Sequence, residues 1–438
     1  MGSRDSAAGL FASASPVFSL GLAQRSVPML TSSTRSGFFS LFIAPSVMLG
    51  ATWLSGCTTP YDPPQFHAPP GESTEFAGIA TMLQSAPDKT LDVLIVHGMC
   101  TQDAQWAAES IRDLNAMLGG KDPVAPKRTD VPGTRVQLYQ QNLAIAGGHV
   151  RANALAWWPV IAPLKEQLCY DQSNKSQVCV DSGNSTPAYP YQRASINKVL
   201  KDEMIDDCLA DALIYQGKSR DFISGQIQTA ILRALATPGG EGTATQQVQR
   251  VATEQTPLVI LAESLGSKVV FDALNGLLSN ADDAKGQAAR QTFMRTRTVF
   301  MMANQLPLLG LADQNLQTGI NALDTDDRYP QDPIRAMVIK LGDAASPQSP
   351  RAGASRALAN LPGPQLVMFS DPSDLLTFVS TPKSEQVPFY PLVNVLVSND
   401  NTLLGFLERP DKAHEAYTGN KQVLRLMACG NPSRNCPE

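Results

Sequence analysis

The sequence predicts an α/β fold in which helices cover both faces of a mainly parallel central sheet. Three observations support this prediction: apolar runs rich in β-branched residues recur along the chain, helical patterns stand between many of them, and no internal repeat is visible. Strands that alternate with helices pair in parallel, and a strand buried on both faces is apolar throughout. With 438 residues, of which 43% are hydrophobic, the chain can bury a large core.

The first predicted strand is LDVLIVHG (91–98), an apolar run that a glycine ends. Residues 103–120 follow with apolar side chains at helical spacing and a Gly-Gly stop. Residues 134–144 predict the next strand. Further strands are predicted at 256–263, 295–303, 364–371 and 391–400.

Residues 145–255 interrupt this alternation inside a domain that is expected to span 76–438. The segment contains an amphipathic pattern at 221–236 and has two interpretations: a packed helical decoration, or a cap-like insertion over a substrate site. Trp157 and Trp158 lie in it; side chains of this kind could line an acyl pocket but are more often found in cores and interfaces.

Residues 1–56 have the layout of a secretory signal peptide. Arg25 and Arg35 precede an uncharged apolar stretch at 38–57, which small residues and a cysteine close. Met29 would be a more ordinary start of such a leader, with the residues before it as an extension. A second irregular stretch, residues 342–363, is expected to be a surface loop.

The end of this leader, LSGC (54–57), resembles the bacterial lipobox. The resemblance implies that the Cys57 thiol carries diacylglycerol and that the mature protein is a lipoprotein of the cell envelope. Residues 57–75 are rich in proline and predict a tether to the membrane, and Thr58 would favour the outer membrane of a double-membraned bacterium. The alternative is a permanent transmembrane helix, which Pro45 disfavours.

Cysteine usage supports export. The chain has seven cysteines, so six remain if one carries lipid, and an even number is typical of disulfides in an oxidising compartment. Short separations favour two pairs and leave a third, although six cysteines allow fifteen connectivities. Zinc is the competing interpretation, but the chain has no CxxC pair. The expected disulfides are Cys169 with Cys179, Cys429 with Cys436, and Cys100 with Cys208.

Ser264 stands at an abrupt junction in LVILAESLGSKVVF (258–271), between an apolar run and a helical pattern. A tight strand-to-helix turn exposes the Oγ atom of a serine nucleophile and directs the next backbone amide at a developing oxyanion. Small residues on each side of the serine let the strand and the helix approach. Here Ala262 takes the place of the first glycine of the GxSxG pattern, and Gly266 is the second.

At this motif, residues 90–430 resemble the α/β-hydrolase superfamily. The resemblance implies a catalytic order of serine, acid and histidine. His414 is the one histidine of four that follows Ser264, and it stands between the last predicted strand and a C-terminal helix. The alternative for His414 is a surface histidine on a polar turn. The other histidines are His67, His97 and His149.

Two aspartates follow the predicted strand in LVMFSDPSDLL (366–376), and both are candidates for the acid. The resemblance favours Asp374, because apolar residues follow it. Asp371 would then stabilise the turn before Pro372, although both aspartates are good turn formers. The acid would hold the histidine in one tautomer and stabilise its protonated form.

The oxyanion site needs a second amide besides that of Leu265. In the superfamily a His-Gly pair at the end of an early strand leads into this loop, and His97 and Gly98 occupy that place. The resemblance therefore implies the backbone amides of Met99 and Leu265 as donors, with His97 in a structural role. Cys100 is not expected to be a nucleophile, because the chain offers it a disulfide.

The leading hypothesis is a membrane-anchored serine hydrolase that cleaves a carboxylic ester or lipid acyl bond through an acyl-enzyme on Ser264. An acyltransferase with the same triad and a catalytically inactive scaffold lipoprotein are the alternatives. No metal or organic cofactor is implied, because no HExxH or similar motif is present. Lys and Arg total 35 against 40 acidic residues without a basic run, so a nucleic-acid partner is not expected.

Overall fold

The structure is a computed structural model of the chain. Residues 1–56, the expected signal peptide, and residues 342–363, the expected surface loop, lie outside the described residues. The described part spans residues 57–436, with gaps at 182, 184–186, 188, 237–241, 280–282, 314–363, 381–390, 404–407 and 434–435.

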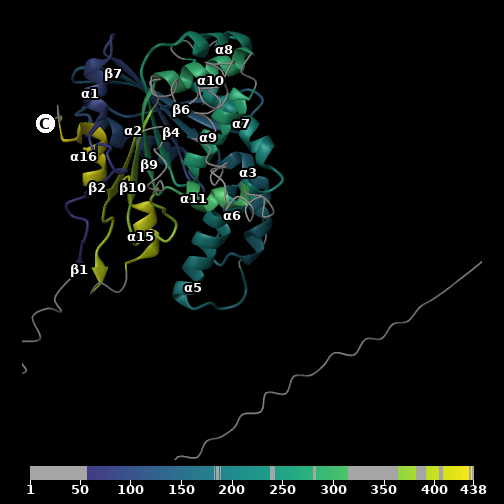
Figure 1. Cartoon of the computed structure of the whole chain (residues 1–438). Coiled ribbons are helices and arrows are strands. Elements are labelled where there is room, and N and C mark those ends of the chain that lie inside the picture. Colours follow the sequence, from purple (N-terminus) through teal and green to yellow (C-terminus); the bar gives the residue numbers. More distant parts are fainter. Residues whose placement is uncertain are drawn as a thin grey trace, which may run out of the picture. The chain divides into compact units, whose positions relative to one another are not determined.

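A nine-stranded sheet forms the centre of the domain (Figure 1). The six strands from β11 to β7 pair in parallel, and the outer strands β2, β6 and β5 pair antiparallel. The predicted mainly parallel α/β fold is therefore confirmed. In spatial order the strands are β2 (Gln65–His67), β11 (Leu392–Leu396), β10 (Gln365–Ser370), β9 (Thr296–Met302), β8 (Leu258–Glu263), β4 (Thr90–Val96), β7 (Gly148–Ala156), β6 (Gln137–Ile145) and β5 (Lys127–Asp130).

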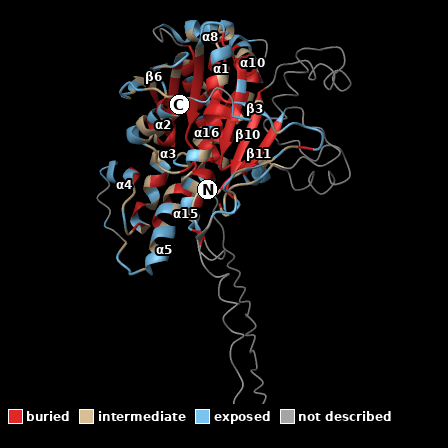
Figure 2. Ribbon diagram, turned by 90° about the vertical axis from the view of Figure 1, so that its left-hand side faces the viewer, coloured by how far each residue is buried: buried red, intermediate tan, exposed pale blue. Residues whose placement is uncertain are grey.

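Helices cover both faces of the sheet, as Figures 1 and 2 show. Alternate side chains of β4 enter two separate cores: Leu94 and Val96 one, Val93 and Ile95 the other. This burial on both faces explains why the strand is apolar throughout. The first core includes residues of α7 (Arg220–Leu235), α8 (Ala244–Thr253), α9 (Leu265–Leu278) and α10 (Ala284–Arg295). The second includes residues of α1 (Ile79–Ser85), α2 (Ala104–Met117) and α16 (Lys421–Cys429).

All six predicted strands are present, but β7 lies inside 145–255, which contained no predicted strand. This strand was not predicted because it contains polar residues. Arg151 forms an ion pair with Asp92, with 2.5 Å between Nε and Oδ1, and Asn153 accepts a 2.7 Å hydrogen bond from Gln140. The helical segment begins only after this strand. It contains α3 (Trp158–Lys165), η2 (Glu166–Asp171), α4 (Gln177–Asp181), α5 (Ser195–Val199), η3 (Leu200–Leu209) and α6 (Ala210–Gln216).

The segment expected to be a tether contributes to the folded domain. β1 (Cys57–Thr58) pairs with β12 (Thr402–Leu403), and β2 forms an edge of the central sheet. Further along, β3 (Phe76–Ala77) pairs with β13 (Gly430–Asn431). Aromatic packing contributes to this docking: the ring centroid of Phe76 lies 6.5 Å from that of Phe66 and 6.2 Å from that of Phe300 in β9. Its proline content was a poor guide, since prolines are tolerated in an edge segment.

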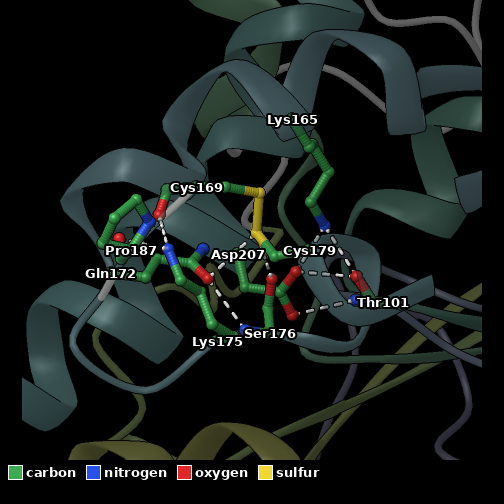
Figure 3. The surroundings of a disulfide bond; sticks show 9 residues. All are labelled: Thr101, Lys165, Cys169, Gln172, Lys175, Ser176, Cys179, Pro187 and Asp207. Atoms are coloured by element: carbon green, nitrogen blue, oxygen red, sulfur yellow. Dashed lines mark hydrogen bonds and ion pairs between the residues drawn. A yellow bond between two sulfur atoms is a disulfide. The ribbon is translucent and has the colours of Figure 1, made fainter. Parts of the chain in front are cut away.

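Three disulfides are present and confirm the expected pairs: Cys100–Cys208, Cys169–Cys179 and Cys429–Cys436. Figure 3 shows the second of these beside Lys175 and Gln172. Disulfides are typical of extracytoplasmic compartments. Within the described residues, no helix is both long and apolar enough to cross a membrane.

Removing the long-range disulfide is expected to destabilise the fold more than removing a local one. Cys100 and Cys208 are 108 residues apart, whereas Cys169 and Cys179 are 10 apart. Because a longer closed loop restricts the unfolded chain more, replacing both cysteines by serine should cost about 4–5 kcal/mol for the first pair and about 2–3 kcal/mol for the second. Urea unfolding of the two double variants measures this, and equal losses would contradict it.

Candidate active site

Ser264 lies in a strained turn between β8 and α9. Its φ of 52° and ψ of −124° are rare for a residue other than glycine, and it directly precedes the first residue of α9. The strand pairing holds this conformation, since the Ser264 amide donates a 2.7 Å hydrogen bond to the Met302 carbonyl at the end of β9. The predicted junction therefore has the backbone conformation of a sharp turn, which directs the Ser264 side chain away from the path of the strand.

Two glycines permit a close approach between this turn and the end of β4. A Cβ atom on Gly266 would lie 2.5 Å from the His97 carbonyl oxygen, and one on Gly98 would lie 2.6 Å from the Cβ of Ser264. Both positions are therefore closed to any larger residue without movement of the backbone. Ala262 is fully buried in β8, so the domain accommodates its methyl group.

His414 links Ser264 to Asp374. It lies in α15 (Pro410–Glu415), where its Nε2 atom is 3.2 Å from the Ser264 Oγ. Its Nδ1 atom is 2.9 and 3.0 Å from the two carboxylate oxygens of Asp374. The carboxylate neighbour places the proton on Nδ1, which leaves Nε2 to accept the serine hydroxyl. Three side chains that are distant in sequence thus form one hydrogen-bonded row.

The structure brings Asp374 to His414 and gives Asp371 a different set of contacts. The Asp371 carboxylate accepts hydrogen bonds from the amides of Ser373, at 2.9 Å, and Asn399, at 2.5 Å. Asp371 thus joins its own turn to the loop after β11. Burial raises the pKa of its carboxyl group to about 7.

Tyr417 contacts Asp374, and no sequence motif pointed to it. Its side chain is fully buried, donates a 3.1 Å hydrogen bond to Asp374 Oδ2 and accepts one of 2.7 Å from the Asp371 amide. Leu376 adds a backbone hydrogen bond of 2.9 Å to Asp374 Oδ1. Tyr417 follows His414 by three residues. Side chains at this spacing lie close together only where the chain is helical, so the spacing alone did not reveal the role of Tyr417.

Acidic groups surround the His414 imidazole. Burial lowers the pKa of His414, but the hydrogen bond and charge of Asp374 outweigh this, with smaller contributions from Glu263 and Glu415, so its pKa lies above the usual value. Burial raises the pKa of Glu263, beside Ser264, to about 7. The site therefore favours the protonated imidazole, the form that arises when a histidine takes a proton from serine.

His97 has a structural environment. Its Nδ1 atom donates to the Gly98 carbonyl at 2.9 Å, and its Nε2 atom accepts from the Trp157 amide at 2.8 Å. The ring stacks on the Trp157 indole, with 5.2 Å between centroids, and burial lowers its pKa to about 3. The neutral His97 ring therefore ties the end of β4 to the end of β7. Trp157 itself is part of the core, being 1% exposed.

The loop after β4 is attached to the helical segment. Cys100 is bonded to Cys208, so its sulfur is not a free thiol. The next residue, Thr101, donates through its amide and its hydroxyl to the Asp207 carboxylate, at 3.1 and 2.7 Å. Lys165 lies 2.6 Å from the same carboxylate, as Figure 3 shows. A disulfide and a buried ion pair therefore hold the loop that contains Met99.

The amides of Met99 and Leu265 have no hydrogen-bond acceptor among the described residues. For Leu265 this follows from its position, because the first amides of a helix have no partner within the helix. Two amide donors, one on each side of the β4–β8 contact, are thus left without an acceptor in the described part of the chain.

Potential metal ligands do not form a fitting centre here. The one such group in the described part of the chain is Cys100, Cys208 and Glu415, with ligand atoms within 4.8 Å of one another. Both sulfurs belong to a disulfide, and metal binding requires thiolates.

A cavity of about 30 Å³, roughly the space of one water, is lined by Glu263 and Trp106 among other residues.

Comparisons of the chain with protein-family models, with curated proteins and with solved structures gave no match. What the candidate site does therefore has to be inferred from its geometry.

We expect the pKa of His414 to fall when Asp374 is replaced by asparagine. The substitution would remove the charge and the acceptor that raise this pKa, while the burial that lowers it remains. Asp371→Asn is the matched control and should change the His414 pKa less, because Asp371 does not contact the ring. NMR titration of the histidine ring signals measures both variants. A larger fall in the control would contradict the assignment of Asp374.

Proposed function

We propose that the protein is a serine hydrolase of the α/β-hydrolase type that cleaves a carboxylic ester or lipid acyl bond through an acyl-enzyme on Ser264. The hydrogen-bonded row of Ser264, His414 and Asp374 is the observation that carries the proposal. A serine hydroxyl is a poor nucleophile without a base, and the row supplies the base and the group that orients it. The strained turn at Ser264 adds support, because it presents the hydroxyl group at the end of a parallel strand.

In the proposed reaction, the Ser264 Oγ attacks the ester carbonyl carbon while His414 Nε2 takes the hydroxyl proton. The tetrahedral intermediate collapses, the bond to the alcohol oxygen breaks, and His414 returns its proton to the leaving alcohol. A water molecule then attacks the acyl-enzyme, gives its proton to His414 and releases the acid. Asp374 keeps the proton of the imidazole on Nδ1 and stabilises the imidazolium in each half of the reaction.

The amides of Met99 and Leu265 are the proposed donors to the oxyanion. Their hydrogen bonds would cost no rearrangement of the loop, because the Cys100–Cys208 disulfide and the Thr101 contacts already hold it. His97 acts indirectly, by fixing the turn from which the Met99 amide projects.

The strand positions also agree with an α/β-hydrolase fold. Ser264 follows β8, Asp374 follows β10 and His414 follows β11, so all three lie beyond the carboxyl ends of parallel strands. The helical segment between β7 and α7 is the proposed cap. Its link to the Met99 loop supports this, since a cap must be placed relative to the reacting groups. Acyl transfer by the same triad would need another alcohol or an amine in place of water.

Ser264→Ala should abolish labelling by a fluorophosphonate and lower the turnover of a short nitrophenyl ester. His414→Ala should have a similar effect, a loss of about 10⁴- to 10⁶-fold in kcat, because triad members act as a unit. Asp371→Asn is the control and should retain most of the activity. In the parent, kcat/KM should rise with pH through the pKa of His414, since the neutral ring is the base. Equal labelling of parent and Ser264→Ala would leave the inactive scaffold as the better proposal.

We further propose that Cys57 carries the lipid of an envelope lipoprotein. The lipobox resemblance motivates this, and the disulfides agree with export. Cys57→Ser should move the protein from the detergent phase to the aqueous phase in a Triton X-114 partition of signal-processed protein, because a lipid chain contributes about 0.8 kcal/mol per buried methylene. Cys436→Ser is a matched control, since it removes a disulfide cysteine and should leave partitioning unchanged. Partition of the parent into the aqueous phase would count against the anchor.

A further inference from the structure

Exposed apolar side chains gather on one part of the helical segment. Tyr191, Ile196, Val199, Leu200 and Ile205 are 71%, 73%, 42%, 37% and 42% exposed, and together they define the α5–η3 face. Figure 2 shows α5 in the colour of exposed residues. Large apolar side chains are usually exposed singly on a monomer, so five within fifteen residues indicate a surface that is covered in use.

Four of the apolar residues of this face follow one another along α5 and η3. Leu200 and Ile205 line one open groove together with Ala194 and the polar residues Arg193, Asn197 and Lys201. Ile196 and Val199 lie on the adjoining turns of α5, with Leu200 directly after them. A face formed by two consecutive helical turns is suited to lie flat on a broad apolar surface.

Charged groups within the same segment neutralise one another. Arg193 pairs with Asp171 at 2.7 Å and with Asp202 at 3.2 Å. Lys201 pairs with Asp171 at 2.5 Å and also with Asp206. Two of these carboxylates, Asp202 and Asp206, are buried. Lys198 and Glu203 add one charge of each sign to the same stretch, so the face has no strong net charge of either sign. Such a face fits a zwitterionic lipid surface better than a strongly charged partner.

The α5–η3 face lies at the same end of the domain as β1, which begins at Cys57. This strand pairs with β12, which precedes α15 in the chain. The end of α15 is close to the end of η3, because a Glu415 carboxylate oxygen lies within 4.8 Å of the Cys208 sulfur. Figure 1 shows β1, α15 and α5 at the same lower end of the domain.

We propose that the α5–η3 face docks on a phospholipid bilayer. The proposal rests on the lipid anchor at Cys57 and extends it. Since residues 57–77 pair with the domain and do not form a free spacer, a lipid on Cys57 would bring the bilayer to this end of the domain. The anchor then makes docking intramolecular, so a small apolar face suffices. Docking would also turn the carboxyl ends of the strands, with Ser264, toward the lipid surface.

The test uses tryptophan reporters in the mature protein, which begins at Cys57 after signal processing. The protein is reconstituted into phosphatidylcholine vesicles with brominated acyl chains. Ile196→Trp and Ile205→Trp each place a fluorophore on the face. Phe222→Trp is the matched control, because Phe222 is 62% exposed on α7, outside the face. We expect the two reporters to shift to the blue and to be quenched by the bromines, and the control to show neither effect. The quenching should persist in 1 M salt, where charges are screened beyond about 3 Å.

One further variant tests the cause. Adding Val199→Asp to the Ile196→Trp protein should abolish the quenching, whereas the protein should still float with the vesicles through its anchor. Reporters that stay unquenched while the protein floats with the vesicles would overturn docking and leave the anchor intact. Protein that does not float would overturn both. Unquenched reporters with a detergent-stable dimer that Val199→Asp dissociates would show a second copy on this face, contrary to the proposal.

Discussion

The close backbone approach between the end of β4 and the turn after β8 is the constraint on which the candidate site depends. Gly98 and Gly266 leave no room for a Cβ atom at this contact, and Ser264 adopts a positive φ to complete it. The cost of such a conformation, about 1–3 kcal/mol, is borne by the parallel sheet that surrounds it. Because strand pairing sets both sides of the contact, the serine and the two open amides keep a defined geometry.

Buried polar side chains then extend this geometry outward. Tyr417 joins the turn of Asp371 to the carboxylate of Asp374, and Asp374 in turn orients His414. Each of these groups has partners within the core, which avoids the cost of an unpaired buried polar atom. The same logic applies on the other side of the site, where Thr101 and Asp207 anchor the loop after β4. The helical segment is thus part of the support of the site.

Much of the fold could be predicted because several of its strands are apolar throughout. β4 and β8 are buried on both faces, so their composition alone distinguished them. β7 could not be recognised, because Arg151 and Asn153 are polar positions whose partners come from other strands. The same holds for β2, a three-residue edge strand in a proline-rich stretch. Pairing partners that are distant in the chain leave no local signal.

The sequence by itself determined the α/β class, six of the strands and the serine at a strand-to-helix junction, and it favoured the three disulfide pairs that the structure contains. These follow from local composition, spacing and a small number of cysteines. Only the tertiary structure showed that Asp374 rather than Asp371 contacts His414, that Tyr417 contacts Asp374 and that strands within 57–77 pair with the domain. Both aspartates occupy the same kind of turn, so the choice between them depends on where α15 packs. That position is set by contacts across the whole domain, and no short stretch of sequence encodes it.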